Sequence, residues 1–179
     1  NGGFSRSYIR GISEAKGLNN FNLGFYFDIR IKKSLFLYTG VLVKSSTGAS
    51  NIDPYSLDDK GLDSLFMGGE IIRKLKYFYV PIFLKYKLGQ HFFADAGFQV
   101  GLLYRATDEF TDKVYKKEDL VFKNDVKDDY NRLDVGVSIG VGYKITKGIG
   151  TAIGIRYYTG LTNIDKSGPK AYNSNLYIY

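Results

Sequence analysis

His91 is the only histidine of this chain, and it is the side chain best suited to transfer a proton near neutral pH. A hydrolase triad or an acyltransferase needs such a histidine close to a nucleophile and an acid. Ser34 and Asp95 could supply these groups, but no catalytic motif surrounds either residue. The sequence therefore favours a histidine without a catalytic role, and a lipid-modifying enzyme stays as an alternative.

Acidic residues in the polar stretches are the candidates for a metal site, namely Asp58-Asp59, Asp125 and Asp128-Asp129. None has the Asp-x-Asp-x-Asp-Gly spacing of a calcium loop, so we expect solvated acids. The chain has no cysteine, which excludes a thiolate metal site and a disulfide scaffold. We therefore expect no catalytic residue, no metal and no cofactor.

A further group of polar residues occurs singly, each between two apolar neighbours, and shares its alternate positions with glycines. Such residues could form the selectivity ring of a narrow channel. They could also form a plug of salt bridges, and the plug is favoured because side chains fill a narrow barrel. The predicted interior polar network consists of Asp28, Arg30, Lys85, Asp95, Gln99, Asp134 and Arg156.

The elements that must position this network are strands, because apolar and polar residues alternate with a period of two. In residues 21–32 every odd position is apolar, and the even positions hold polar residues, glycine or tyrosine. Each full run is about ten residues, the length of a tilted membrane-crossing strand. The alternation repeats in residues 35–44, 75–88, 91–105, 133–145 and 149–161, with partial strands at 4–10 and 175–179.

The connections between these runs alternate between short and long. Residues 32–34, 88–90 and 146–148 are tight turns, whereas 46–74, 105–131 and 162–174 are longer polar loops. This pattern predicts an all-β protein with a single domain over residues 1–179. The domain is an eight-stranded antiparallel transmembrane β-barrel with short periplasmic turns and longer extracellular loops. Both termini are expected on the short-turn side.

Composition supports a membrane barrel over the other classes. No apolar run approaches the about 18–20 residues of a transmembrane helix, and the mean hydropathy is only −0.19. The net charge of +7 is not accompanied by a basic surface interleaved with aromatic residues, so nucleic acid is not an expected partner. The chain starts at Asn1 without a signal peptide, which indicates a mature form or a fragment. The first and last predicted strands are short, so either both are truncated or the barrel closes imperfectly.

The apolar face is predicted to point outward, toward lipid. A soluble barrel that binds a ligand would reverse the two faces, but here the polar face carries many glycines and single charges. Glycine beside large side chains makes room inside a narrow barrel, where opposite charges can pair. We therefore expect an aromatic girdle at the strand ends, formed by Tyr77, Phe78, Tyr79, Tyr86, Tyr104, Tyr143, Tyr157 and Tyr158.

Several lysines fall near the short-turn ends of the predicted strands and predict a basic periplasmic rim. Our hypothesis is that this rim anchors lipid headgroups or docks an acidic periplasmic partner. Simple snorkelling of the lysines toward water is the other interpretation. The rim consists of Lys32, Lys33, Lys87, Lys144 and Lys147, with Lys85 close to it.

Two pairs of segments resemble a known family. The segments are 79–86 (YVPIFLKY) with 94–103 (ADAGFQVGLL), and 133–143 (LDVGVSIGVGY) with 155–164 (IRYYTGLTNI). Together they resemble the outer-membrane β-barrel family typical of Bacteroidetes, often called PorT-like or "porin family". The resemblance runs from about residue 21 to 164. The resemblance implies a barrel in the bacterial outer membrane. Some members of that family assist protein secretion, so it also makes such a role an expectation here.

The sequence thus predicts an integral outer-membrane protein that is not an enzyme. We expect a structural or accessory subunit of a larger envelope complex for secretion, transport or assembly, in contact with outer-membrane lipids and a protein partner. A narrow pore for small solutes and a lipid-modifying barrel enzyme are the alternatives.

Overall fold

The computed structural model describes residues 2–12, 14–66, 68–111, 121–145 and 151–179. Among these residues no helix is long and apolar enough to cross a membrane. The short elements are α1 (Lys60–Phe66) and the 3-10 turn η1 (Lys127–Asp129). The strands are β1 (Gly2–Arg10), β2 (Lys16–Arg30), β3 (Leu35–Ile52), β4 (Glu70–Leu88), β5 (Phe92–Thr111), β6 (Val121–Asp125), β7 (Leu133–Lys144), β8 (Ala152–Gly160) and β9 (Tyr172–Ile178).

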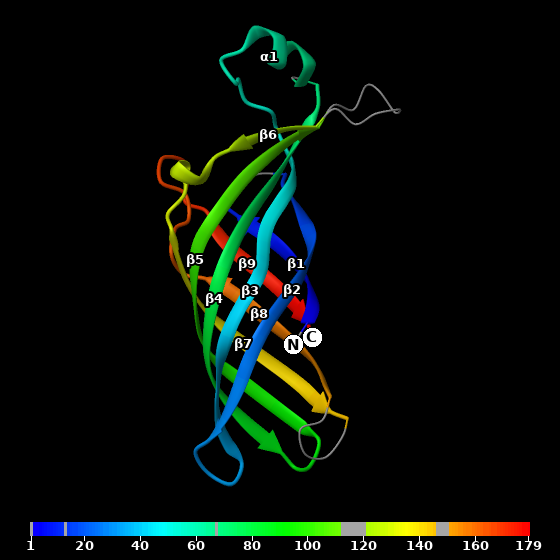
Figure 1. Ribbon diagram of the computed structural model, residues 1–179, viewed down its shortest axis with the longest axis vertical. Coiled ribbons are helices and arrows are strands. Elements are labelled where there is room, and N and C mark those ends of the chain that lie inside the picture. The colour runs from blue at the N-terminus through cyan, green and yellow to red at the C-terminus, as the bar shows by residue number, and fades with distance from the viewer. Residues whose placement is uncertain (1, 13, 67, 112–120, 146–150) are drawn as a thin grey trace.

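All of these strands except β6 form one closed antiparallel barrel of eight strands, as predicted. Each pairs with the next along the chain, β5 pairs directly with β7, and β9 returns to pair with β1. The β6 strand pairs with the outer end of β5 and lies outside the barrel (Figure 1). Closure matters because a lipid-exposed sheet edge would leave backbone groups unpaired. The terminal strand residues Gly2 and Ile178 lie part way along the wall, opposite Leu23 and Ile155, and not at the short-turn rim where the termini were expected.

Alternating burial confirms that the apolar face points outward. On β2 the side chains of Phe25 and Phe27 are each 65 % exposed, whereas on β4 Tyr79 and Phe83 are 0 % exposed. A soluble barrel would bury its aliphatic and phenyl side chains and expose its charges. Because large apolar side chains cover the outside around the barrel, the surrounding medium must be lipid.

The predicted aromatic girdle is right for some residues and wrong for others. Tyr77, Tyr79 and Tyr158 are fully buried and face the interior. In the alternation of their strands these three residues occupy inward positions. Their closeness to the strand ends does not reveal this. The exposed members of the girdle are Phe78, Tyr86, Tyr143 and Tyr157.

Two of the predicted loops contain the outer ends of barrel strands, so the predicted bounds of these loops were wrong. β3 continues to Ile52 and β4 begins at Glu70, within the predicted loop 46–74. β5 likewise continues to Thr111, within the predicted loop 105–131. Backbone ladders persist beyond the membrane because a small apolar cluster of Phe66, Ile71 and Phe110 supports them. The predicted turn at 146–148 lies outside the described residues.

These extensions form a projection that we call the outer arm, visible at the top of Figure 1. It comprises the outer ends of three barrel strands together with α1 and β6. Because the long connections of such barrels are extracellular, the outer arm faces the outside of the cell. Its residues are 45–52, 60–66, 70–77, 105–111 and 121–125.

The glycines of the inward face make a stability test possible. A Cβ atom at Gly101 would overlap the ring of Tyr79, whereas one at Gly68 would meet nothing within 4 Å. Gly101→Val should therefore destabilise the barrel by about 1–3 kcal/mol through overpacking. The measurement is the urea midpoint of the folded band on unheated gels. Gly68→Val is the matched control and should unfold like the wild type, and equal midpoints for all three proteins would contradict the packing described.

Candidate functional site

Inside the barrel, a buried ion pair joins β5 and β8, the two strands that flank β7. Arg156 of β8 donates from Nε to Oδ1 of Asp95 and from Nη2 to Oδ2, both at 2.9 Å. The two side chains are only 6 % and 0 % exposed. Gly140 of β7 lies between them in register, and a Cβ atom there would come within 2.8 Å of the Asp95 carboxylate. Glycine on β7 therefore permits the pair to form across the strand.

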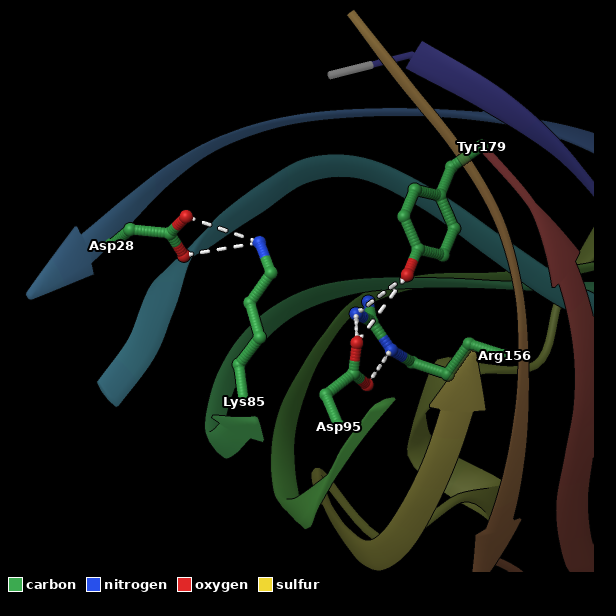
Figure 2. A network of polar contacts seen from close by, with 5 residues as sticks. All are labelled: Asp28, Lys85, Asp95, Arg156 and Tyr179. Carbon is green, nitrogen blue, oxygen red and sulfur yellow. Dashed lines mark hydrogen bonds and ion pairs between the residues drawn. The ribbon is translucent and has the colours of Figure 1, made fainter. Parts of the chain in front are cut away.

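Aromatic rings surround this ion pair. The Arg156 guanidinium lies 4.5 Å from the ring centre of Phe83 and 5.2 Å from that of Tyr38. The hydroxyl of Tyr179 lies 3.2 Å from Arg156 Nη2 and 3.4 Å from Asp95 Oδ2 (Figure 2). Ring faces and bidentate hydrogen bonds together offset the cost of removing both charges from water.

A second ion pair lies nearer the short-turn end. Lys85 donates from Nζ to Asp28 at 3.0 Å, and the Asp28 side chain is 40 % exposed (Figure 2). The Lys85 ammonium also lies 4.5 Å from the ring centre of Phe93. Because Asp28 is open to water, this pair contributes much less to stability than the buried one.

The outer half of the interior holds a carboxylate for which the described residues provide no cationic partner. Asp134 is 0 % exposed and accepts hydrogen bonds of 2.7 Å from the Tyr79 hydroxyl and from Asn173 Nδ2. Gln99 is also buried and points into the barrel. Its side-chain amide donates to the Tyr177 hydroxyl at 3.4 Å. The interior at this level is therefore a packed network of neutral donors around one acid.

A cavity of about 660 Å³ lies at the short-turn end of the barrel. Lys87 and Lys144 line it, so two of the predicted rim lysines face the cavity. Lys87 lies on the inward phase of β4, and its ammonium is 4.0 Å from the ring centre of Phe36. The idea that Lys87 anchors lipid headgroups was therefore wrong, because its side chain points into the barrel.

The remaining predicted cations at this end lie at its edge. Arg30 is the last residue of β2 and is exposed. Its assignment to the interior network was wrong. At the end of β2 an inward-pointing side chain already lies beyond the packed part of the interior. Lys32 and Lys33 are exposed in the turn after β2, and Lys147 lies outside the described residues.

His91 has no catalytic partners of the kind considered above. Its Nδ1 atom is 2.9 Å from the carbonyl oxygen of Lys144, and its ring stacks on Tyr143 with centres 5.2 Å apart. Asp95 is bonded to Arg156 and so is not available to orient the imidazole. The candidate triad of Ser34, His91 and Asp95 is thus not assembled.

The outer arm contains an ion pair that the sequence did not reveal. Arg73 donates from Nε to Asp108 at 2.8 Å and from Nη2 at 2.6 Å, and Asp108 is 0 % exposed. The Tyr55 hydroxyl donates to the same carboxylate at 3.3 Å and accepts from Asn124 at 3.0 Å. One carboxylate thereby ties β4, β5, β6 and the segment before α1 together. Only the cross-strand register of Arg73 and Asp108 could have indicated the pair.

Acidic residues around α1 have structural roles. Asp59 accepts hydrogen bonds from the backbone N–H groups of Gly61 and Leu62, so it caps the helix. Asp63 accepts from the Leu57 N–H at 2.7 Å and the Ser56 hydroxyl at 2.6 Å. These two hydrogen bonds hold the pKa of Asp63 below its usual range. The helix and the preceding segment are therefore fixed to each other.

A closed barrel with an apolar outer face and a packed polar interior defines an integral outer-membrane β-barrel. The family described as "Outer membrane protein beta-barrel domain" matches residues 1–166, and the chain belongs to that family. The protein therefore lies in the bacterial outer membrane, as predicted.

Solved structures with a similar fold include two of Ail, the attachment invasion locus protein of Yersinia pestis. The complex of Ail with the heparin analogue sucrose octasulfate is 10 % identical, with a TM-score of 0.49. A second Ail structure is 11 % identical, with a TM-score of 0.46. Each comparison covers 99 % of this chain and 91 % of the Ail chain. No curated protein matches the sequence.

The buried ion pair gives a second stability test. Asp95→Asn should destabilise the barrel by about 3–5 kcal/mol, because it leaves the Arg156 charge buried without a counter-ion. Urea unfolding in detergent micelles measures the loss. The control Asp28→Asn removes the exposed partner of Lys85 and should cost at most about 1 kcal/mol.

Replacing both partners, as Asp95→Leu with Arg156→Met, should recover most of the stability lost in Asp95→Asn. A double variant no more stable than Asp95→Asn would show that the charges themselves hold the barrel together.

Proposed function

We propose that this protein is a non-conducting, non-enzymatic barrel that serves as an accessory subunit of a larger envelope assembly. The observation that carries the proposal is the outer arm, which has its own apolar cluster and its own buried ion pair, Arg73 with Asp108. Extracellular connections that only link strands need neither. A folded arm that projects from a membrane barrel is suited to hold a partner in a fixed orientation.

The packed interior supports a role other than solute passage. The Asp95–Arg156 pair, the rings around it and the buried Asp134 network occupy successive levels of the barrel. An eight-stranded barrel has an interior just wide enough for side chains to fill. The narrow-pore alternative therefore requires that these groups move apart.

The surface of the outer arm offers features that a protein partner can use. Leu65 of α1 and Val121 of β6 are 48 % and 46 % exposed. Within the described residues β6 pairs only with β5, so its second edge presents backbone donors and acceptors. A partner could add a strand to that edge and cover both apolar side chains.

The sequence resemblance to PorT-like barrels supports the same proposal, because some of those barrels assist secretion. A lipid-modifying enzyme is the weaker alternative, since Asp95, the acid considered as the partner of a His91 base, is bonded to Arg156. Replacement of His91 should leave envelope lipids unchanged.

Purification from outer membranes in mild detergent tests the accessory role. The wild type should retain a companion protein at a fixed ratio, identified by mass spectrometry. Leu65→Gln with Val121→Gln should lose that companion while the barrel still assembles. The control pair Lys60→Gln with Lys123→Gln changes exposed cations of the same arm and should keep the companion. A wild-type barrel that purifies alone would contradict the proposal.

Planar-bilayer recordings test the closed interior separately. The wild type should show no stepwise conductance, because the ion pair and its rings fill the lumen. Asp95→Ala with Arg156→Ala removes that obstruction and should raise the frequency of small conductance steps. Stable unitary steps in the wild type would favour the narrow pore over the accessory role.

A further inference from the structure

The height of the membrane can be located on β4. Its outward side chains from residue 78 to residue 88 are all apolar or aromatic and all 42–54 % exposed. Ten residue steps of about 3.3 Å, tilted by about 40°, span about 25 Å, the height of the apolar band of such barrels. The outward position that follows on the extracellular side is Lys76. The headgroup level of the outer leaflet therefore lies at Lys76.

Two neighbouring strands place cations close to Lys76. Arg105 of β5 is the direct cross-strand partner of Lys76. On β3 the partner of Lys76 is Ser46, and Lys44 lies two residues nearer the membrane on the same strand. We call Lys44, Lys76 and Arg105 the outer basic row. Neighbouring strands are about 4.8 Å apart, so these long side chains can approach one bound group.

Register shifts bring Lys44 and Arg105 to the outward face of their strands. The pairing of β3 with β4 shifts between Leu42 and Ser45, and that of β4 with β5 shifts next to Lys76. Each shift adds one residue to its strand, so Lys44 and Arg105 face outward and are exposed. Bulges commonly re-aim side chains in this way. Without them, regular alternation would turn both Lys44 and Arg105 toward the interior.

The row carries positive charge that its neighbours do not neutralise. Like charges directly opposite each other on a sheet, such as Lys76 and Arg105, are destabilising. The nearest outward-facing acid on β5, Glu109, is bonded to Lys74 at 2.5 Å and also contacts Lys123. Among the described residues, no ion pair involves the outer basic row. An anion from outside the chain would relieve the repulsion.

Aromatic rings lie directly on the membrane side of the row. Phe78 and Tyr104 pack with ring centres 4.5 Å apart, and the Lys44 ammonium lies 5.7 Å from the ring centre of Phe21. From the outside inward, the surface therefore presents cations, then aromatic rings, then aliphatic side chains. A lipid with a phosphate, a sugar and acyl chains in the same order matches these three layers.

We propose that the outer basic row binds the phosphate of a phosphorylated glycolipid of the outer leaflet. The acyl chains of that lipid would lie along Val80 and Leu102, which are exposed on the outward face below the row. Arg105 can engage two phosphate oxygens at once, and the two lysines add charge without fixed geometry. This site is independent of the protein partner proposed for the outer arm.

Lipid titration of the purified full chain in detergent, followed by native mass spectrometry, tests the site. The probes are bis-phosphorylated lipid A, the same lipid without phosphates, and free inorganic phosphate. Lipid A should bind the wild type at least tenfold more tightly than the dephosphorylated lipid. Free phosphate should not compete at equal concentration, because it lacks the acyl chains.

The triple variant Lys44→Gln, Lys76→Gln and Arg105→Gln should weaken lipid A binding at least tenfold and lower its salt dependence. The control Lys60→Gln, Lys123→Gln and Lys170→Gln removes three exposed cations elsewhere and should change binding less than twofold. Lys76→Arg with Arg105→Lys keeps the charges and should bind like the wild type. If the triple variant does not fold, single Lys76→Gln should still weaken binding several-fold.

Equal affinity of the wild type and the triple variant would overturn the proposal, and so would equal binding of lipid with and without phosphates. Competition by free phosphate would show a simple anion site. None of these results bears on the companion protein, because the triple variant leaves Leu65 and Val121 unchanged.

Discussion

Lipid offers no partner for a backbone hydrogen bond, and this constraint shapes the whole protein. The eight strands must close on themselves, and β9 completes the barrel by pairing with β1. A barrel of that size has a narrow interior, so its side chains must pack against one another and its charges must be paired. The bidentate contact of Arg156 with Asp95, the glycine between them and the rings around them follow from that requirement.

The protein changes its character at the level of the two register shifts. Below them, outward side chains are apolar and inward ones are polar or aromatic. Above them, the same strands continue in water, with Lys74 and Glu109 paired on the outside and Arg73 and Asp108 buried inside. The shifts mark the boundary between the membrane barrel and the outer arm. Partner binding is proposed for the tip of the outer arm, at α1 and β6, and lipid binding for the boundary itself.

The alternation of residue types predicted the strands inside the membrane and the direction of their faces, because lipid and a packed interior demand different side chains. It did not predict the outer ends of β3, β4 and β5, where both faces carry polar residues. The alternation alone was enough to predict that four polar residues are buried, namely Asp95, Gln99, Asp134 and Arg156. Arg30 was misplaced because alternation does not show where the packed interior ends. Lys87 was misplaced because its place near the strand end was given more weight than its inward phase. The bond between Asp95 and Arg156 requires cross-strand register, which one sequence does not contain.

Spin labels along β4 test this account most directly, and the absence of cysteine makes single labels straightforward. Labels at residues 74 to 88 should show maxima of oxygen accessibility at every even position from 78 to 88, with minima at the odd positions. At residues 76 and 74 accessibility should change from oxygen to a water-soluble nickel reagent. Maxima at odd positions would reverse the two faces, and oxygen accessibility that continues through 74 would place the outer basic row inside the membrane.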